Sequence, residues 1–126
     1  MTYPKELKYT KDHEWVSIED DRAIVGITDY ALEQLGDVVH IELPGEGEEF
    51  ESGATFGTIE STKTVSDLYM PVSGKILSVN KDLEDNLETL ASSPYKEGWL
   101  VKISIDELSE ELLSAADYES FIAEDE

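Results

Sequence analysis

The sequence of 126 residues contains no cysteine, only two histidines, and nine basic residues against thirty acidic ones. Without cysteine the chain can form no disulfide framework, thiol nucleophile or thiolate metal site. The formal net charge of −21 argues against nucleic acid and anionic membrane surfaces as partners, because both would repel the chain. No apolar run approaches the length of a membrane span, and residues 1–8 lack the apolar core of a signal peptide, so we expect a cytoplasmic protein.

The usual signatures of an active site are also missing. His13 and His40 each sit inside a strand pattern, which favours a structural imidazole over a catalytic one. Gly45-Glu-Gly47 is a lone fragment followed by acids, so it is no phosphate loop, and Asp82–Asp85 lacks the glycine and alternating ligands of a calcium loop. We find no nucleophile–base pair and no metal-ligand set. Any chemistry is therefore expected to depend on a group attached to the chain.

One lysine stands out within this acidic sequence. Lys63 is the only basic residue between Arg22 and Lys75. Alternation over Phe56–Ser61 predicts a half-buried strand before it, and Val65–Tyr69 predicts a second strand after it, which places Lys63 near the tip of a β-hairpin. A lysine on a turn is usually just solvated. An isolated amine on an exposed turn in an acidic field also suits a residue that another protein finds and modifies.

The rest of the chain predicts a mainly β fold. Residues 14–27 indicate a hairpin, and Thr28 and Gly36 suit the two ends of a short helix over Asp29–Leu35. Further strands are expected over residues 38–43, 74–80 and 99–105, and a short helical or looped segment pinned by Leu83, Leu87 and Leu90. Toward the C-terminus, helical spacing predicts terminal helices carrying two sets of apolar residues, Leu108, Leu112 and Leu113, and then Tyr118, Phe121 and Ile122. This pattern is typical of a small β-sandwich or barrel with helical additions.

Several ordered segments carry a family resemblance over roughly Tyr9 to Tyr118. The chain resembles the H protein of the glycine cleavage system, a lipoyl-carrying shuttle. The matching segments are Tyr9–Trp15, Val25–Ala31, Gln34–Asp37, Ile41–Pro44, Glu60–Lys63, Ser66-Asp67, Pro71–Gly74, Ser93–Tyr95 and Gly98–Ile103. The family usually has Val before the lysine, where this chain has Thr62, a swap that keeps β-branching.

The resemblance implies a barrel-sandwich hybrid of the lipoyl/biotinyl type, as a single carrier domain over residues 1–126 with its core over about 9–122. It implies that Lys63 carries lipoic acid as N6-lipoyllysine, with Glu60, Ser61 and Thr62 forming the recognition turn. It also implies a cleft for the loaded arm near His13, Glu14 and Asp67, where the carboxylate of Glu14 could pair with an aminomethyl cation. The family often has Ser where this chain has Asp12.

The resemblance also implies the partners and a non-catalytic role. A pyridoxal-phosphate glycine decarboxylase loads an aminomethyl group onto the arm, a folate-dependent aminomethyltransferase removes it, and dihydrolipoyl dehydrogenase reoxidises the dithiol. A lipoate-attaching enzyme must act first, and we expect the carrier to be a monomer. The acidity either serves solubility alone or steers the chain toward basic docking faces on these partners.

Four alternatives stay open. A biotinyl carrier shares the architecture, but its lysine is usually flanked by Met, whereas Lys63 lies between Thr62 and Thr64. A lipoyl domain of a 2-oxo acid dehydrogenase would be shorter and tethered to a larger enzyme. An H-like protein could relay lipoyl groups to other proteins. Finally, the chain could be an acidic interaction module in which Lys63 is never modified.

Overall fold

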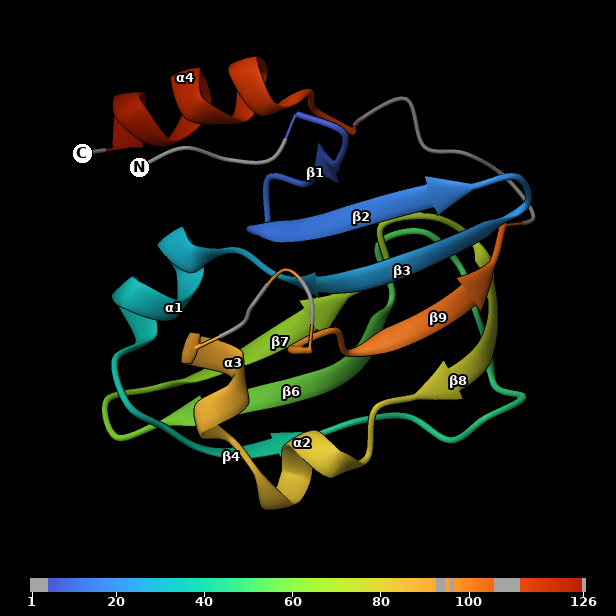
Figure 1. Ribbon diagram of the computed structural model, residues 1–126, viewed down its shortest axis with the longest axis horizontal. Helices are drawn as coiled ribbons and strands as arrows, with labels where there is room; N and C mark the ends of the chain where they lie inside the picture. The colour runs from blue at the N-terminus through green and yellow to red at the C-terminus, as the bar shows by residue number, and fades with distance from the viewer. Residues whose placement is uncertain (1–4, 93–94, 96, 106–111, 126) are drawn as a thin grey trace.

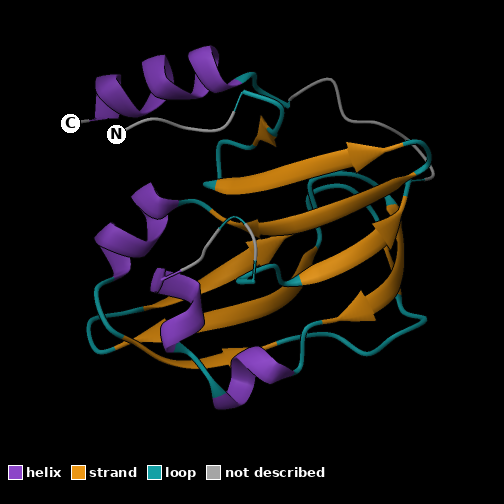
Figure 2. Cartoon of the chain, viewed as in Figure 1, coloured by secondary structure: helices purple, strands orange, loops and turns teal. Residues whose placement is uncertain are grey.

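Two β-sheets face each other across the main hydrophobic core. The computed structural model describes residues 5–92, 95, 97–105 and 112–125. One sheet has six strands in the order β1-β2-β3-β9-β8-β5, and the other has three in the order β4-β6-β7 (Figures 1 and 2). The core between them combines side chains from both sheets, among them Val16, Val25 and Ile103 from the first and Ile59 and Leu68 from the second. The mainly β prediction is thus confirmed, and its strands form two sheets.

The strands of the six-stranded sheet are all paired antiparallel. Their bounds are β1 Lys8–Tyr9, β2 Glu14–Glu19, β3 Arg22–Ile27, β5 Glu49–Phe50, β8 Gly74–Val79 and β9 Val101–Ser104. The predicted hairpin over residues 14–27 is confirmed, with Trp15 opposite Gly26. A side chain on Gly26 would collide with the Trp15 ring, so glycine at this position makes room for the indole.

The three-stranded sheet carries the lysine hairpin. It comprises β4 Val38–Glu42, β6 Thr55–Ser61 and β7 Val65–Tyr69, again all antiparallel. The predicted alternation over Phe56–Ser61 is only partly right. The pairing of β6 with β7 shifts between Thr55 and Gly57, so Phe56, Ile59 and Ser61 are buried rather than every second residue. A β-bulge of this kind inserts one unpaired residue and breaks the two-residue period, which a strict pattern cannot anticipate.

Four helices lie around the sheets in the described part of the chain, with bounds α1 Asp29–Leu35, α2 Asp82–Asp85, α3 Glu88–Ser92 and α4 Ala115–Asp125. The prediction for α1 is confirmed at both ends. Thr28 accepts a hydrogen bond from the backbone N–H of Ala31, and Gly36 follows the last turn with φ +81°. None of these helices is both long enough and apolar enough to span a membrane.

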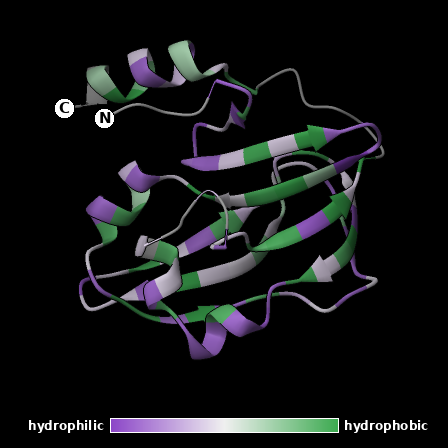
Figure 3. Ribbon diagram, viewed as in Figure 1, coloured by the Kyte–Doolittle hydropathy of each residue, from purple (hydrophilic) through white to green (hydrophobic). Residues whose placement is uncertain are grey.

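The segment between β8 and β9 contains the helices α2 and α3, with Leu83 and Leu90 buried in the core. Figure 3 shows the hydrophobic residues concentrated in the strands, whereas α2 is largely hydrophilic. The expected pinning of this segment by leucines is confirmed for these two side chains. Each helix has only five residues or fewer, so packing against the core stabilises them rather than intrinsic propensity.

The C-terminal prediction needs a correction. Leu112 and Leu113 do not belong to a helix, because Leu113 forms an isolated antiparallel bridge with Tyr9. Leu108 lies outside the described residues. The second predicted apolar set does lie on a helix, α4, which runs beside β1 (Figure 1). Helical spacing of leucines therefore overestimated the C-terminal helix, since backbone pairing with β1 competes for the same residues.

A second apolar cluster joins α4 to the sheet. It is built mostly from aromatic and aliphatic side chains that are largely buried, namely Leu7, Tyr9, Trp15, Tyr30, Ala115, Tyr118 and Ile122. Tyr9 and Tyr118 stack with ring centroids 4.9 Å apart and planes 12° apart. This cluster, which we call the α4 cluster, is separate from the main core and lies close to the N-terminus of α1 through Tyr30.

Candidate functional site: a lysine turn beside an acidic cleft

The turn between β6 and β7 exposes Lys63 and is organised by one hydroxyl. Ser61 is 5% exposed, and its Oγ accepts the backbone N–H groups of Lys63 and Thr64, both at 3.2 Å. The same hydroxyl donates to the carbonyl of Thr64 at 3.3 Å, and the Ser61 N–H donates to that carbonyl at 2.8 Å. These bonds fix the backbone of the turn, while the side chain of Lys63 stays exposed.

The hairpin tip is also attached to the end of α1. The backbone N–H of Thr62 donates to the carbonyl of Asp37 at 3.0 Å. A Cβ built on Gly36 would lie 3.4 Å from Cε and 3.7 Å from Nζ of Lys63, so the lysine stem lies along this glycine. The hairpin-tip prediction is confirmed, but the turn rests on α1 rather than standing free.

The charge around Lys63 is one-sided. Glu60 and Thr62 are exposed beside it, and Asp37 is exposed next to Gly36. Within residues 5–92, 95, 97–105 and 112–125, no carboxylate lies within ion-pair distance of Nζ. The amine is thus available to solvent within an acidic environment.

A cleft opens along the other side of the same hairpin. Its volume is about 140 Å³, and it is enclosed by the start of β2, the end of β3, one face of α1, and strands β6 and β7. The lining residues are Asp12, His13, Glu14, Ile27, Ala31, Gln34, Leu35, Ile59, Ser66, Asp67 and Leu68. The structure therefore brings together His13, Glu14 and Asp67, the three residues predicted for the arm cleft.

Glu14 is the buried acid of this cleft. Its side chain is 2% exposed, one carboxylate oxygen accepts the N–H of Tyr69 at 2.8 Å, and the other accepts the Thr10 hydroxyl at 3.5 Å. Burial raises the pKa of Glu14 well above its ordinary value, and the charge of Asp12 adds to this, whereas the two hydrogen bonds act in the opposite direction. A buried carboxyl without a cation partner favours its neutral form.

Two more carboxyl groups make the cleft cation-attracting. Asp12 and Asp67 are exposed and line its edge. The negative charge of Asp67 is the main reason why the pKa of Tyr69 is raised. Ile27, Leu35 and Leu68 supply apolar walls opposite these acids. The arrangement suits a small organic cation on an apolar stem.

His13 lies outside the strand in which its sequence pattern placed it. Its φ is +67°, in the left-handed region, and β2 begins only at Glu14. Its Nδ1 lies 2.9 Å from the hydroxyl of Tyr118, and its ring is 4.9 Å from that of Tyr30. The structural role expected for this imidazole agrees with these contacts, although the strand assignment was wrong.

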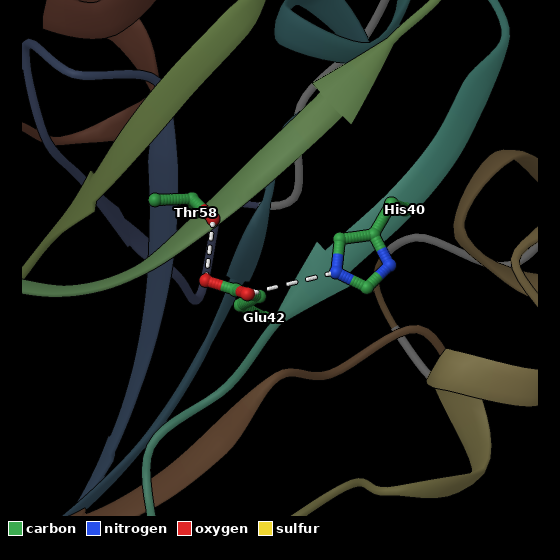
Figure 4. A network of polar contacts seen from close by, with 3 residues as sticks. All are labelled: His40, Glu42 and Thr58. Carbon is green, nitrogen blue, oxygen red and sulfur yellow. Dashed lines mark hydrogen bonds and ion pairs between the residues drawn. The ribbon is translucent and has the colours of Figure 1, made fainter.

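His40 belongs to a different surface. It lies on β4, 57% exposed, with Nε2 3.8 Å from Oε1 of Glu42. The other carboxylate oxygen, Oε2, accepts the hydroxyl of Thr58 at 3.5 Å (Figure 4). The strand assignment of His40 is confirmed, but its imidazole is exposed rather than structural. None of these three residues lines the cleft.

Sequence reasoning missed most of the cleft. Ile27, Ala31, Gln34 and Leu35 come from the end of β3 and from α1, and no local pattern links them to Lys63. Thr10 was missed as well, although it holds Glu14. Among the lining residues, Ile59 had a local signal, because it belongs to the alternating pattern predicted for Phe56–Ser61.

The fold and site together define a carrier-type domain, in which a rigid β scaffold presents one lysine on a fixed turn. Comparison with known proteins narrows this class. The family model for the glycine cleavage H-protein matches residues 7–125. The glycine cleavage system H proteins of two Staphylococcus epidermidis strains are 54% and 53% identical to the chain, each over 126 residues covering 98% of the chain and 100% of the relative.

A solved structure agrees with the sequence relatives. The crystal structure of a glycine cleavage system H protein from Mycobacterium marinum matches with a TM-score of 0.92 at 42% identity, covering 96% of this chain and 99% of the other. The chain therefore belongs to the glycine cleavage system H protein family, and it is a carrier subunit of that system. This family is lipoate-bearing, which sets aside the biotinyl and 2-oxo acid dehydrogenase alternatives.

Proposed function

We propose that Nζ of Lys63 carries lipoic acid in amide linkage and that the chain is a non-catalytic shuttle of the glycine cleavage system. It would take an aminomethyl group from the pyridoxal-phosphate glycine decarboxylase to the folate-dependent aminomethyltransferase, and then present the dithiol to dihydrolipoyl dehydrogenase. The observation that carries this proposal is the pairing of one exposed lysine with an acidic, apolar-walled cleft on the same hairpin. Monomeric state and cytoplasmic location, where these partners would meet it, belong to the same proposal.

The lysine turn provides a fixed attachment point for a mobile arm. Lipoate, when bound, supplies a dithiolane that exchanges electrons and carries the one-carbon cargo. The Ser61 hydroxyl and the Asp37 carbonyl hold the backbone of the turn. Amide formation removes the charge of Nζ, so the stem loses its attraction to neighbouring acids and can leave Gly36. The recognition turn of Glu60, Ser61 and Thr62 would then act through its shape as well as its charge.

The cleft retains the cargo, which is the aminomethyl group carried on the arm. An aminomethyl group is cationic when protonated, and Asp12, Glu14 and Asp67 are the acids that could hold it. Ile27 and Leu35 would exclude water from the group, which limits its loss by hydrolysis. Because Glu14 has a raised pKa in the cation-free cleft, docking of a cation should favour its ionised form and release a proton.

The first experiment measures attachment. The purified chain is incubated with a lipoate–protein ligase, lipoate and ATP, and its intact mass and modified peptide are determined. We expect one lipoyl addition, at Lys63, and none in Lys63→Arg. Lys75→Arg is the matched control, because Lys75 is also an exposed lysine but lies on strand β8 of the other sheet rather than on the turn.

The outcomes separate the remaining alternatives. Absence of lipoylation in a chain shown to be folded would overturn the proposal and leave an unmodified acidic interaction module. Lipoylation without turnover by glycine decarboxylase would favour the H-like relay of lipoyl groups to other proteins. Turnover that depends on Lys63 would support the shuttle.

A further inference from the structure

The hydroxyl of Tyr118 closes a ring of hydrogen bonds between three distant segments. Tyr118 lies on α4 and is 0% exposed. Its hydroxyl oxygen lies 2.9 Å from Nδ1 of His13 and 2.8 Å from Oγ1 of Thr28. The third side of the ring is a backbone bond, in which the N–H of Thr28 donates to the carbonyl of His13 at 3.1 Å. Each residue therefore holds the other two in place.

Both partners of Tyr118 belong to the frame of the cleft. His13 lines the cleft between Asp12 and Glu14, which line it too. Its left-handed backbone is costly for a residue other than glycine, so it needs fixed surroundings. Thr28 caps α1, the helix that contributes the opposite wall.

The ring of Tyr118 is packed among other aromatic rings. It stacks on Tyr9 at 4.9 Å, and Phe121, one turn further along α4, lies 5.9 Å from the His13 ring. These contacts belong to the α4 cluster, which is separate from the main core. The hydroxyl is thus a polar connection from α4 to the cleft, and it lies behind His13 rather than among the residues that line the cavity.

We propose that Tyr118 is a positioning residue of the arm cleft. Through its hydroxyl, α4 holds His13 and the N-terminus of α1 at a fixed separation and so keeps two walls of the cleft at the spacing that retains the cargo. Tyr118 touches no cargo and acts only through His13 and Thr28. This inference rests on the proposed function, since the cleft is assigned a role there.

The first test uses the unlipoylated full chain. In Tyr118→Phe we expect hydrogen exchange at the amides of His13 and Thr28 to accelerate about fivefold to tenfold, the factor that one lost hydrogen bond of ordinary strength produces. Amides of β9, in the six-stranded sheet, should keep their wild-type rates. Tyr30→Phe is the matched control, because it removes a hydroxyl from another ring that packs on His13. Uniform acceleration across the chain would overturn the inference in favour of a role in global stability alone.

The second test follows the loaded protein. We expect Tyr118→Phe to lose the aminomethyl group about fivefold to tenfold faster than wild type, with unchanged lipoylation at Lys63. In a His13→Ala background, the same substitution should accelerate the loss less than it does in wild type, because only the connection to Thr28 is then left to break. Independent, additive effects would overturn the inference. If Tyr118→Phe does not fold, Thr28→Val opens the same ring from its other side. Because it also removes the hydroxyl that caps α1, exchange at the His13 amide, which lies outside α1, is then the readout.

Failure of this inference and failure of the proposed function give different results. If wild type takes up no lipoate, or loses the cargo as fast as an unprotected adduct in solution, the proposed function fails, and hydrogen exchange still decides whether Tyr118 holds His13 and Thr28. If wild type retains the cargo and Tyr118→Phe retains it equally, only the positioning role is overturned.

Discussion

The Lys63 turn and the cleft beside it are built in opposite ways. The turn is a local structure, in which Ser61 bonds to residues two and three positions away and the lysine stays exposed. The cleft is assembled from five segments between Asp12 and Leu68, and its central acid, Glu14, is 2% exposed. Apart from its contacts with Gly36 and Asp37, the turn should therefore tolerate change elsewhere in the fold, whereas the cleft should respond to substitutions far from it. Attachment of the cofactor and retention of its cargo are expected to be separable properties.

The largest expected effect comes from a substitution in the cleft that should leave the Lys63 turn unchanged. Glu14→Ala removes the buried carboxylate and should accelerate loss of the aminomethyl group about 10–100-fold, since a hydrogen bond to a charged group contributes about 1.5–3 kcal/mol. Lipoylation of Lys63 should continue at the wild-type rate. The decay rate of the loaded protein, monitored through release of the one-carbon unit, measures the effect. Glu51→Ala, an exposed acid outside the cleft, is the control, and a decay rate equal to wild type in Glu14→Ala would refute the retention role.

A substitution at Gly36, against which the Lys63 stem lies, tests the turn. Gly36 has φ +81° and ψ −138°, a conformation that favours glycine, so Gly36→Ala should lower the free energy of unfolding by about 1–3 kcal/mol. Because the Lys63 stem lies on Gly36, lipoylation should also slow. Urea denaturation and a ligase time course measure the two effects.

Gly47→Ala provides the matched control for that experiment. Gly47 has φ +91°, and a Cβ at this position would meet nothing within 4 Å, so the substitution incurs a similar backbone penalty away from Lys63. We expect equal destabilisation and normal lipoylation. Equal slowing in both variants would mean that the contact between Gly36 and Lys63 has no role in attachment.

The raised pKa of Glu14 predicts how stability depends on pH. Between the ordinary value of 4.5 and the raised folded-state value, the folded chain binds more protons than the unfolded chain. The contribution of Glu14 is therefore full below pH 4.5 and is lost as the pH rises through the folded-state pKa. Glu14→Gln removes this titration, so its stability relative to wild type should grow as the pH rises. Denaturant melts at several pH values test this, and a constant difference would contradict the raised pKa.

The smallest expected effect concerns the surface charge that both regions share. If the net charge of −21 steers the chain toward basic faces, raising the salt from about 0.05 to about 0.5 M should increase its KM with glycine decarboxylase a few-fold, because exposed charges are screened over about 4 Å at the higher salt. The kcat should hold steady. A flat KM would assign the acidity to solubility alone.

Local signals predicted the parts of the fold that depend on neighbouring residues. The ends of α1 follow from Thr28 and Gly36, and the hairpin over residues 14–27 follows from alternation around a turn. The errors arose where distant pairing competes with a local pattern. Leu113 bonds to Tyr9 instead of continuing a helix, and the bulge in β6 changes which residues point inward.

The sequence by itself determined the mainly β class, the hairpin, the exposed position of Lys63 and, through ordered matching segments, the family. These features depend on composition and on residue spacing and turn chemistry, which can be recognised in short stretches of the chain. Only the tertiary structure decided that Glu14 is buried against Tyr69, that the Lys63 stem lies on Gly36, and that Tyr118 reaches His13. Those contacts join residues up to 105 positions apart, and no periodicity in the chain encodes such a distance.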